Sequence, residues 1–202
     1  ARLTRAARET VVMKRLLPAL LLPVLAGCLS PAKTPQVANW VLTPKAVEKA
    51  VVDKPVFGET RLAVVYVRSP YDGRPLTVLR DDGSVAFDPY NQFASVPAAL
   101  IKGTALDVLR GTGLFAGVQP AITTADVKTN LELVVDELSL DCRAEGARKA
   151  SVKLILAMVK DRQVVMAEHG AAKVDAADGN YSAAFGTAFS RALAEAVSKF
   201  AK

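Results

Sequence analysis

The feature that most constrains the fold is an alternation of apolar residues along the second half of the chain. Residues 152–158 carry an apolar side chain at every second position, which is the period of a strand with one buried face. Residues 131–135 repeat this pattern, and the apolar phase then shifts to Leu138 and Leu140. A phase shift inside one strand predicts a bulge near Asp136-Glu137. The chain must therefore build a sheet that buries at least one of its faces.

Two segments have helical rather than strand periodicity. The first opens at Ser95-Val96-Pro97, continues with apolar residues at helical spacing to Leu109, and ends at Gly111 and Gly113. The second is amphipathic and runs from Phe185 to Phe200. The order of strands, helix, strands and helix predicts an α+β fold, a single-domain sandwich of a mostly antiparallel sheet with two helices packed on one face.

The remaining strands are shorter or less regular. A run that is apolar on both faces predicts a central strand, and Asp81-Asp82-Gly83 is a strong hairpin turn signal. The strands expected in this way are residues 39–42, the two-faced run Arg61 to Val67, the hairpin arms 76–80 and 84–87, a return at 114–118, and residues 164–169 after the turn Lys160-Asp161-Arg162-Gln163.

The N-terminal region has the three parts of an export signal. Basic residues follow Met13, the run from Leu16 to Leu25 is almost wholly apolar, and small residues precede Cys28. The apolar run is too short to cross a bilayer, which takes roughly 20 residues. Leu25-Ala26-Gly27-Cys28 resembles the lipobox of bacterial lipoproteins, in which the cysteine thiol receives the lipid. Cys28 is therefore the expected lipidation site, and the alternative is an ordinary buried cysteine.

These signals divide the chain into three parts. Residues 1–27 are expected to be the signal peptide, residues 28–37 a lipidated flexible tether containing two prolines, and residues 38–202 the folded body. Met13 is the expected start, with a long basic leader as the alternative. Cys142 is the other cysteine. Acylation of Cys28 would exclude an intrachain disulfide, so Cys142 is expected to be a core thiol.

The charge distribution argues against a nucleic-acid partner. The formal net charge is +6, but residues 1–27 hold five basic residues and one acidic residue. The remaining 175 residues then carry 21 basic and 19 acidic side chains, a surplus of about two positive charges. No basic patch interleaved with aromatic residues is left in the body.

The residues of catalysis are also missing. His169 is the one histidine, which excludes a site built from several histidines. Neither a nucleophile elbow nor a phosphate-binding glycine loop occurs. His169 is expected at the surface, and Asp81, Asp82 and Asp88 lack the spacing of a calcium loop. We expect a protein that is not an enzyme and holds neither a metal nor another cofactor.

A set of short motifs in the body resembles a known family. Tyr90, Phe93 and Pro97 precede the first helix, and Gly113-Leu114-Phe115 follow it. This order resembles the ABC-type transport auxiliary lipoprotein family, the PqiC-like lipoproteins of MCE lipid transport systems, where a tryptophan usually stands at the position of Phe93. Trp40-Val41-Leu42-Thr43-Pro44 is similar to the opening of that family.

The resemblance implies a non-enzymatic auxiliary component of an MCE/ABC-type lipid transporter. Such a protein would dock on the MCE-domain protein, hold it to a membrane by the lipid anchor, and assemble as several copies. Tyr90, Phe93 and Pro97 would then lie at or support the partner interface, and the alternative for these three residues is an aromatic-capped helix entry.

Two other functions stay open. One is an envelope-assembly lipoprotein of the lipopolysaccharide-assembly or Tol-associated type, and the other is a lipoprotein that binds a soluble ligand. Leu29 and Ser30 follow Cys28 with no aspartate of the kind that retains enteric lipoproteins in the inner membrane. The expected location is therefore the cell envelope, on the periplasmic face of the outer membrane.

Overall fold

The computed structural model describes residues 35–43, 52 and 54–202. The signal peptide, Cys28, and all but the last residues of the expected tether lie outside this range. A single compact unit comprises Val37–Lys202, and its secondary structure contains ten described elements. In chain order these are β1 (Ala38–Trp40), β2 (Phe57–Val67), β3 (Pro75–Leu79), β4 (Val85–Phe93), α2 (Pro97–Gly111), β5 (Phe115–Pro120), β6 (Thr129–Asp141), β7 (Lys149–Lys160), β8 (Gln163–Asp175) and α3 (Tyr181–Phe200).

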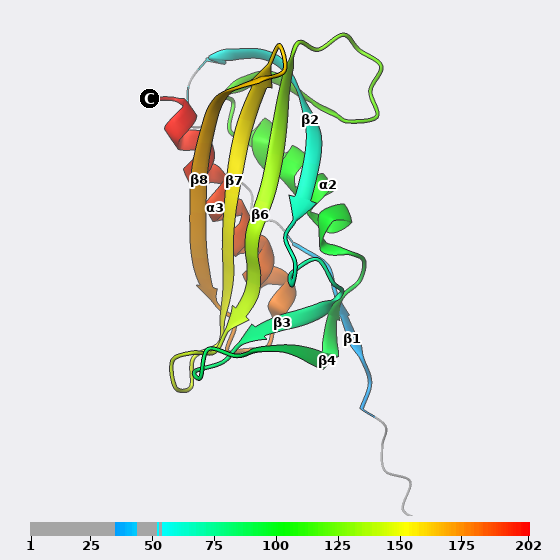
Figure 1. Cartoon of the computed structure of the whole chain (residues 1–202), viewed down its shortest axis with the longest axis vertical. Coiled ribbons are helices and arrows are strands. Elements are labelled where there is room, and N and C mark those ends of the chain that lie inside the picture. The colour runs from blue at the N-terminus through cyan, green and yellow to red at the C-terminus, as the bar shows by residue number, and fades with distance from the viewer. Residues whose placement is uncertain (1–34, 44–51, 53) are drawn as a thin grey trace, which may run out of the picture. The chain divides into compact units, whose positions relative to one another are not determined.

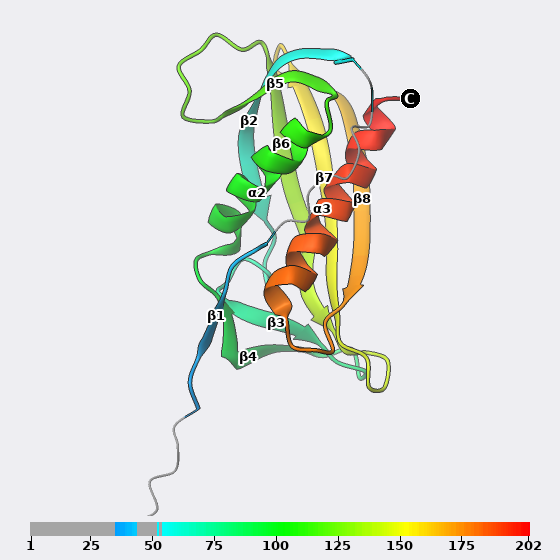
Figure 2. The same ribbon diagram turned by 180° about the vertical axis from the view of Figure 1, so that it is seen from behind.

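The described strands form one sheet, and both helices cover the same face of it (Figures 1 and 2). The long strands β6, β7 and β8 pair antiparallel. Strand β6 also pairs parallel with two strands on its other edge, with β2 along its first half and with β3 near its end. The predicted α+β sheet with two helices on one face is confirmed, and the parallel pairings were not predicted.

Most local predictions from the sequence are confirmed. The register of β6 shifts between Val135 and Glu137, where the bulge was expected. The β3–β4 hairpin turns at Gly83, which has a φ of 81° that favours glycine. Helix α3 starts at Tyr181, where the Asn180 side chain accepts a hydrogen bond from the Ala183 N–H at 3.2 Å.

The prediction that Arg61 to Val67 is buried on both faces is wrong. Strand β2 is central, between β5 and β6, but Val64 and Tyr66 are 44% and 54% exposed. A register shift between Leu62 and Val64 explains the misleading pattern. Before the shift even-numbered residues face the helices, and after it odd-numbered residues such as Val67 do so. The strand therefore has only one buried face, although its sequence is apolar at consecutive positions.

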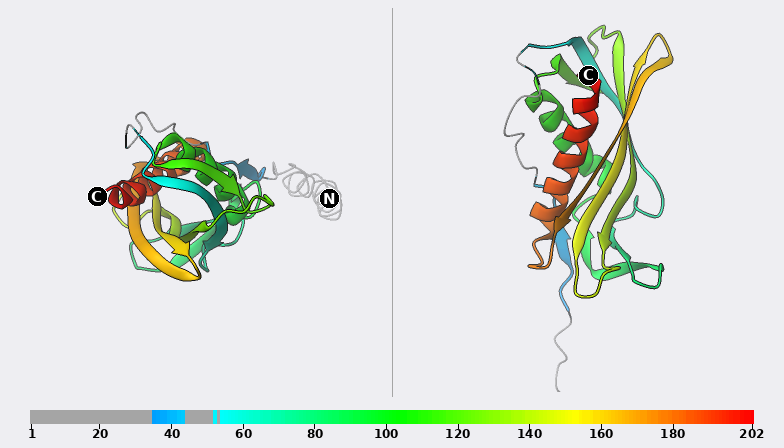
Figure 3. Two further views of the ribbon diagram at one scale, coloured as in Figure 1. Left: turned by 90° about the horizontal axis from the view of Figure 1, so that it is seen from above. Right: turned by 90° about the vertical axis from the view of Figure 1, so that its left-hand side faces the viewer.

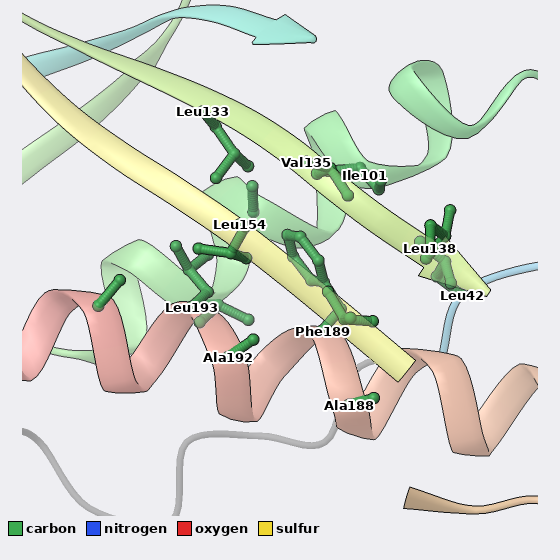
Figure 4. Close-up of a cluster of buried hydrophobic side chains, with 14 of the residues drawn as sticks. Leu42, Ile101, Leu133, Val135, Leu138, Leu154, Ala188, Phe189, Ala192 and Leu193 are labelled. Atoms are coloured by element: carbon green, nitrogen blue, oxygen red, sulfur yellow. The ribbon is translucent and has the colours of Figure 1, made fainter. Parts of the chain in front are cut away.

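The core lies between the helices and the sheet (Figure 4). Leu133, Val135 and Leu154 point from the sheet toward Phe189 and Leu193 of α3, and all five are at most 1% exposed. The close-up also labels Ile101 of α2 beside Val135. Each such side chain contributes about 2 to 3 kcal/mol when it is removed from water. Successive residues of a strand alternate between the two faces of a sheet. The residues between these core positions therefore belong to the opposite face, which carries no helix (Figure 3).

Candidate functional site

The structure separates the three residues that the sequence grouped as a partner interface. Phe93 is 2% exposed, and its ring packs edge-on against Phe185 with the centroids 5.5 Å apart. Pro97 is buried at the start of α2. Tyr90 is 49% exposed in an irregular part of β4, where the Asp88 carboxylate accepts the Tyr90 N–H at 2.8 Å. Phe93 and Pro97 therefore support the helix entry, and Tyr90 is the member of the group that a partner can reach.

The two side chains considered for chemistry lie apart. His169 is exposed on β8, as expected, and its carbonyl oxygen accepts a hydrogen bond from Lys199 Nζ at 2.6 Å. Cys142 is partly buried against the core and forms no disulfide within the described residues. Burial raises the pKa of the Cys142 thiol, so less of the reactive thiolate is present. Within the described residues no group of three histidine, cysteine, aspartate or glutamate side chains is placed to hold a metal ion.

An apolar surface lies on the face of the sheet that carries no helix. Tyr66 of β2 is directly opposite Val134 of β6, and Val134 is directly opposite Ile155 of β7. In the neighbouring row across the strands, Val64 is opposite Glu132, Glu132 is opposite Ala157, and Ala157 is opposite Ala167. Residues in register on adjacent strands have Cβ atoms about 5 Å apart, so the set is contiguous. We call it the outer-face patch, and it consists of Val64, Tyr66, Val134, Ile155, Ala157 and Ala167.

Ion pairs border this patch on the side toward the ends of β2 and β6. Lys153 Nζ lies 2.6 Å from Glu137 Oε2, and Arg68 pairs with Asp136. Ser139 also donates a hydrogen bond of 3.1 Å to Glu137. Burial alone would raise the pKa of the Glu137 carboxyl, but Lys153 and Ser139 more than offset it and leave the pKa lowered. Glu137 therefore carries its negative charge beneath the surface.

A second buried carboxylate continues the same face. Asp141 accepts two side-chain hydrogen bonds from Arg143, at 2.9 and 2.8 Å, and one from Lys173 Nζ at 2.6 Å. The bonds from Arg143 are the largest influence, and with Lys173 they hold the pKa of Asp141 far below its usual range. The sequence contained a signal for these two carboxylates. After the phase shift Leu138 and Leu140 face the core, so residues 137, 139 and 141 must lie on the other face of the sheet.

Two open hollows adjoin the Asp141 end of this face. One, of about 600 Å³, is lined by Asp81 and the loop of residues 142–148. The other, of about 350 Å³, is lined by Asp141, Arg143, Ala144, Ala147, Lys149 and Lys173. The first hollow contains the Cys142 thiol, whose pKa is raised, and no hydrogen bond joins this thiol to a base within the described residues. The second hollow can interact with a ligand through its charges, because three cationic side chains and one carboxylate line it.

The comparisons with known proteins show the fold and no family. No family model matches the sequence, and no curated protein is similar to it at a significant level. A crystal structure of a Xanthomonas campestris protein, described under the family model DUF330, has a TM-score of 0.61 and 14% identity and covers 81% of this chain and 92% of its own. A PelC dodecamer from Paraburkholderia phytofirmans reaches only 0.45 at 12% identity, covering 77% and 92% of the two chains.

These findings correct one prediction from the sequence. The resemblance to the PqiC-like auxiliary lipoproteins is contradicted, because no family model matches and the structure that shares the fold is described under DUF330. The short motifs that suggested the resemblance have structural roles instead. Phe93 and Pro97 are buried at the start of α2. Gly113 lies in the connection between α2 and β5, where its φ of 68° favours glycine.

Proposed function

We propose that the protein is a lipid-anchored, non-enzymatic component of the cell envelope that acts by docking on another protein. The observation that carries the proposal is the outer-face patch. Four adjacent strands contribute to it, and Val64 and Tyr66 at one side are about half exposed. Contiguous apolar surface of this kind on a soluble protein usually marks an interaction site.

The composition of the patch fits a protein partner. Tyr66 is an aromatic residue with a polar tip, a type that is enriched at the centres of protein interfaces. The charges at the rim are paired, Arg68 with Asp136 and Lys153 with Glu137, so a partner meets little unbalanced charge there. Glu132 lies between Val64 and Ala157 on the same face, so a partner must solvate or pair this one carboxylate. An apolar centre with a polar rim is the common anatomy of such interfaces.

The anchor is proposed at Cys28, from the lipobox alone. Among the described residues no helix is long and apolar enough to cross a membrane. Cys28→Ser should leave an unprocessed precursor that takes up no labelled palmitate, because the thiol is the lipid acceptor. Normal labelling of this variant would refute the anchor. Recovery of the wild type only in the inner-membrane fraction of a sucrose gradient would refute the outer-membrane location.

The partner proposed for the patch is an MCE-domain protein of an ABC-type lipid transporter. This partner was implied by the family resemblance rather than by the residues of the patch, and the comparisons lend it no support. The test is co-purification of the acylated protein with an MCE-domain protein encoded beside its gene. Failure with every such protein would reject this partner. Co-purification with an envelope-assembly protein in its place would favour the assembly alternative, and a bound small molecule in native mass spectrometry would favour the ligand-binding one.

Docking through the outer-face patch is tested with Tyr66→Lys. A lysine there adds a charge to an exposed apolar part of the proposed interface, so binding should fall at least about tenfold. The melting temperature should change little, because Tyr66 is exposed. Ile122→Lys is the matched control, since Ile122 is 85% exposed and lies outside the patch. Equal binding by wild type and Tyr66→Lys would refute this surface, and equal losses in both variants would show that added charge alone weakens binding.

A further inference from the structure

We infer that the hollow beside Asp141 binds the phosphate of an anionic lipid headgroup, at the end of the body from which the tether leaves. The inference rests on the proposed lipid anchor for its biological setting, although the site itself belongs to the folded body. Three observations carry it: where the chain enters the body, which residues lie at that end, and how the charges of the hollow are already used.

The N-terminal strand is fastened firmly to the body. Trp40 Nε1 donates a hydrogen bond of 3.0 Å to Asn91 Oδ1 of β4, and the Trp40 ring packs edge-on against Tyr181 of α3, 5.4 Å between centroids. Cys28 precedes Ala38 by ten residues, which span at most about 35 Å when fully extended. An acylated Cys28 would therefore hold the start of β1 within about 35 Å of the bilayer surface.

The hollow lies at the same end as β1. Arg148, in the loop between β6 and β7, donates a hydrogen bond of 3.5 Å to the hydroxyl of Tyr181, the residue that contacts Trp40. Both ribbon views place this loop and β1 at one end of the sheet (Figures 1 and 3). The residues of the hollow thus lie at the end of the body that an acylated Cys28 would keep near a membrane.

The charges of the hollow leave donors for a further anion. Arg143, Lys149 and Lys173 line the hollow with Asp141, a surplus of two positive charges among the lining residues. Asp175 of β8 lies opposite Lys149 at its edge. Arg143 uses Nε and Nη2 on Asp141, and Lys173 uses one N–H. A guanidinium has five N–H groups and an ammonium three, so both cations keep donors free. Lys149 makes no ion pair within the described residues.

The buried Asp141 carboxylate holds the cationic side chains of the hollow in place. Asp141 is 8% exposed and fixes two otherwise flexible cationic side chains by charge-assisted hydrogen bonds. Held cations bind an anion at lower entropic cost than free ones. The acidic residues Asp81 and Glu145 line the adjoining hollow with Arg148, so the positive surplus is local to the Asp141 hollow. This favours one headgroup at a defined place over general attraction to a charged membrane.

Strand β7 supplies a matched pair of variants for the test. It begins at Lys149 in the hollow and ends at Lys160, which is exposed at the opposite end. The mature polypeptide from residue 29, made without its lipid, keeps every described strand and helix because all of them lie within Val37–Lys202. Its sedimentation with vesicles of phosphatidylglycerol or phosphatidylcholine would be measured at low salt, for wild type, Lys149→Glu and Lys160→Glu.

The wild type should bind phosphatidylglycerol at least about tenfold more tightly than phosphatidylcholine, and Lys149→Glu should lose about tenfold while Lys160→Glu stays within about twofold. Two results would overturn the inference: no preference for phosphatidylglycerol, or equal losses in the two variants. Release by inorganic phosphate beyond that caused by chloride at the same ionic strength is expected of a site that holds a phosphate group. Wild-type protein that binds inorganic phosphate but does not sediment with phosphatidylglycerol vesicles would identify a site for free phosphate instead. Because this polypeptide has no acyl chain, failure here is distinct from failure of the anchor, which palmitate labelling of Cys28 tests.

Discussion

The two faces of the sheet use alternate residues of the same strands and meet different demands. Toward the helices, Leu133, Leu154 and Leu156 are almost wholly buried. On the other face, Val134 and Ile155 belong to the outer-face patch, and Glu137 and Asp141 hold ion pairs. The helix-covered face supplies most of the stability because it removes the most apolar surface from water. The other face is then free to carry groups that contribute little to stability and much to recognition.

The contact between α3 and the sheet should be the most sensitive part of the helix-covered face. A Cβ added to Gly170 of β8 would lie 1.8 Å from the backbone oxygen of Ala192. Gly170→Ala should therefore lower the free energy of unfolding by about 3 kcal/mol or more, as measured by denaturant titration. Gly103→Ala is the control, because Gly103 has open space around it in α2 and alanine should stabilise the helix by up to about 1 kcal/mol. Equal effects would show that α3 does not pack as closely as described.

The pair Phe93 and Tyr90 compares a buried and an exposed aromatic ring three residues apart. Phe93→Ala should cost about 3 to 4 kcal/mol of stability, since it empties a site packed against Phe185. Tyr90→Ala should cost about 0.5 kcal/mol or less, because the ring is half exposed. Melting temperature and partner binding would be measured on the same samples. A large loss of stability in Tyr90→Ala would contradict its placement at the surface.

Asp141 should make the other face sensitive to acid. Its pKa is lowered in the folded protein, so its stabilising effect is complete above the unfolded pKa of about 4 and declines as the pH falls below that value. Asp141→Asn should cost about 1 to 2 kcal/mol at pH 7, because Arg143 and Lys173 are about half exposed and screened by solvent.

The Asp141→Asn protein should also lose less stability than the wild type between pH 5 and about 2. Asp72→Asn, at an exposed position, serves as the control for replacing a surface carboxylate by an amide. Parallel profiles for wild type and Asp141→Asn would show that the pair with Arg143 and Lys173 does not form in solution.

The sequence by itself determined the features that depend on neighbouring residues. Alternation over 152–158 predicted β7, the phase shift after Val135 predicted the bulge, and Asp81-Asp82-Gly83 predicted the hairpin. Helices α2 and α3 followed from spacing and end signals. Each of these patterns reflects a local period or a local turn conformation, so a short stretch of chain contains all the information that is needed.

Only the tertiary structure decided the features that depend on pairing between distant segments. The parallel pairing of β2 with β6 exposes Tyr66 and places it beside Val134, although the β2 sequence looked buried on both faces. Asp141 of β6 and Lys173 of β8 form their hydrogen bond because both strands pair with β7, which brings these distant segments of the chain together. The choice of Phe93 over Tyr90 as the core residue likewise depends on Phe185, far along the chain. Register and burial are set by which surfaces pack together, and the periodicity of one segment does not contain that information.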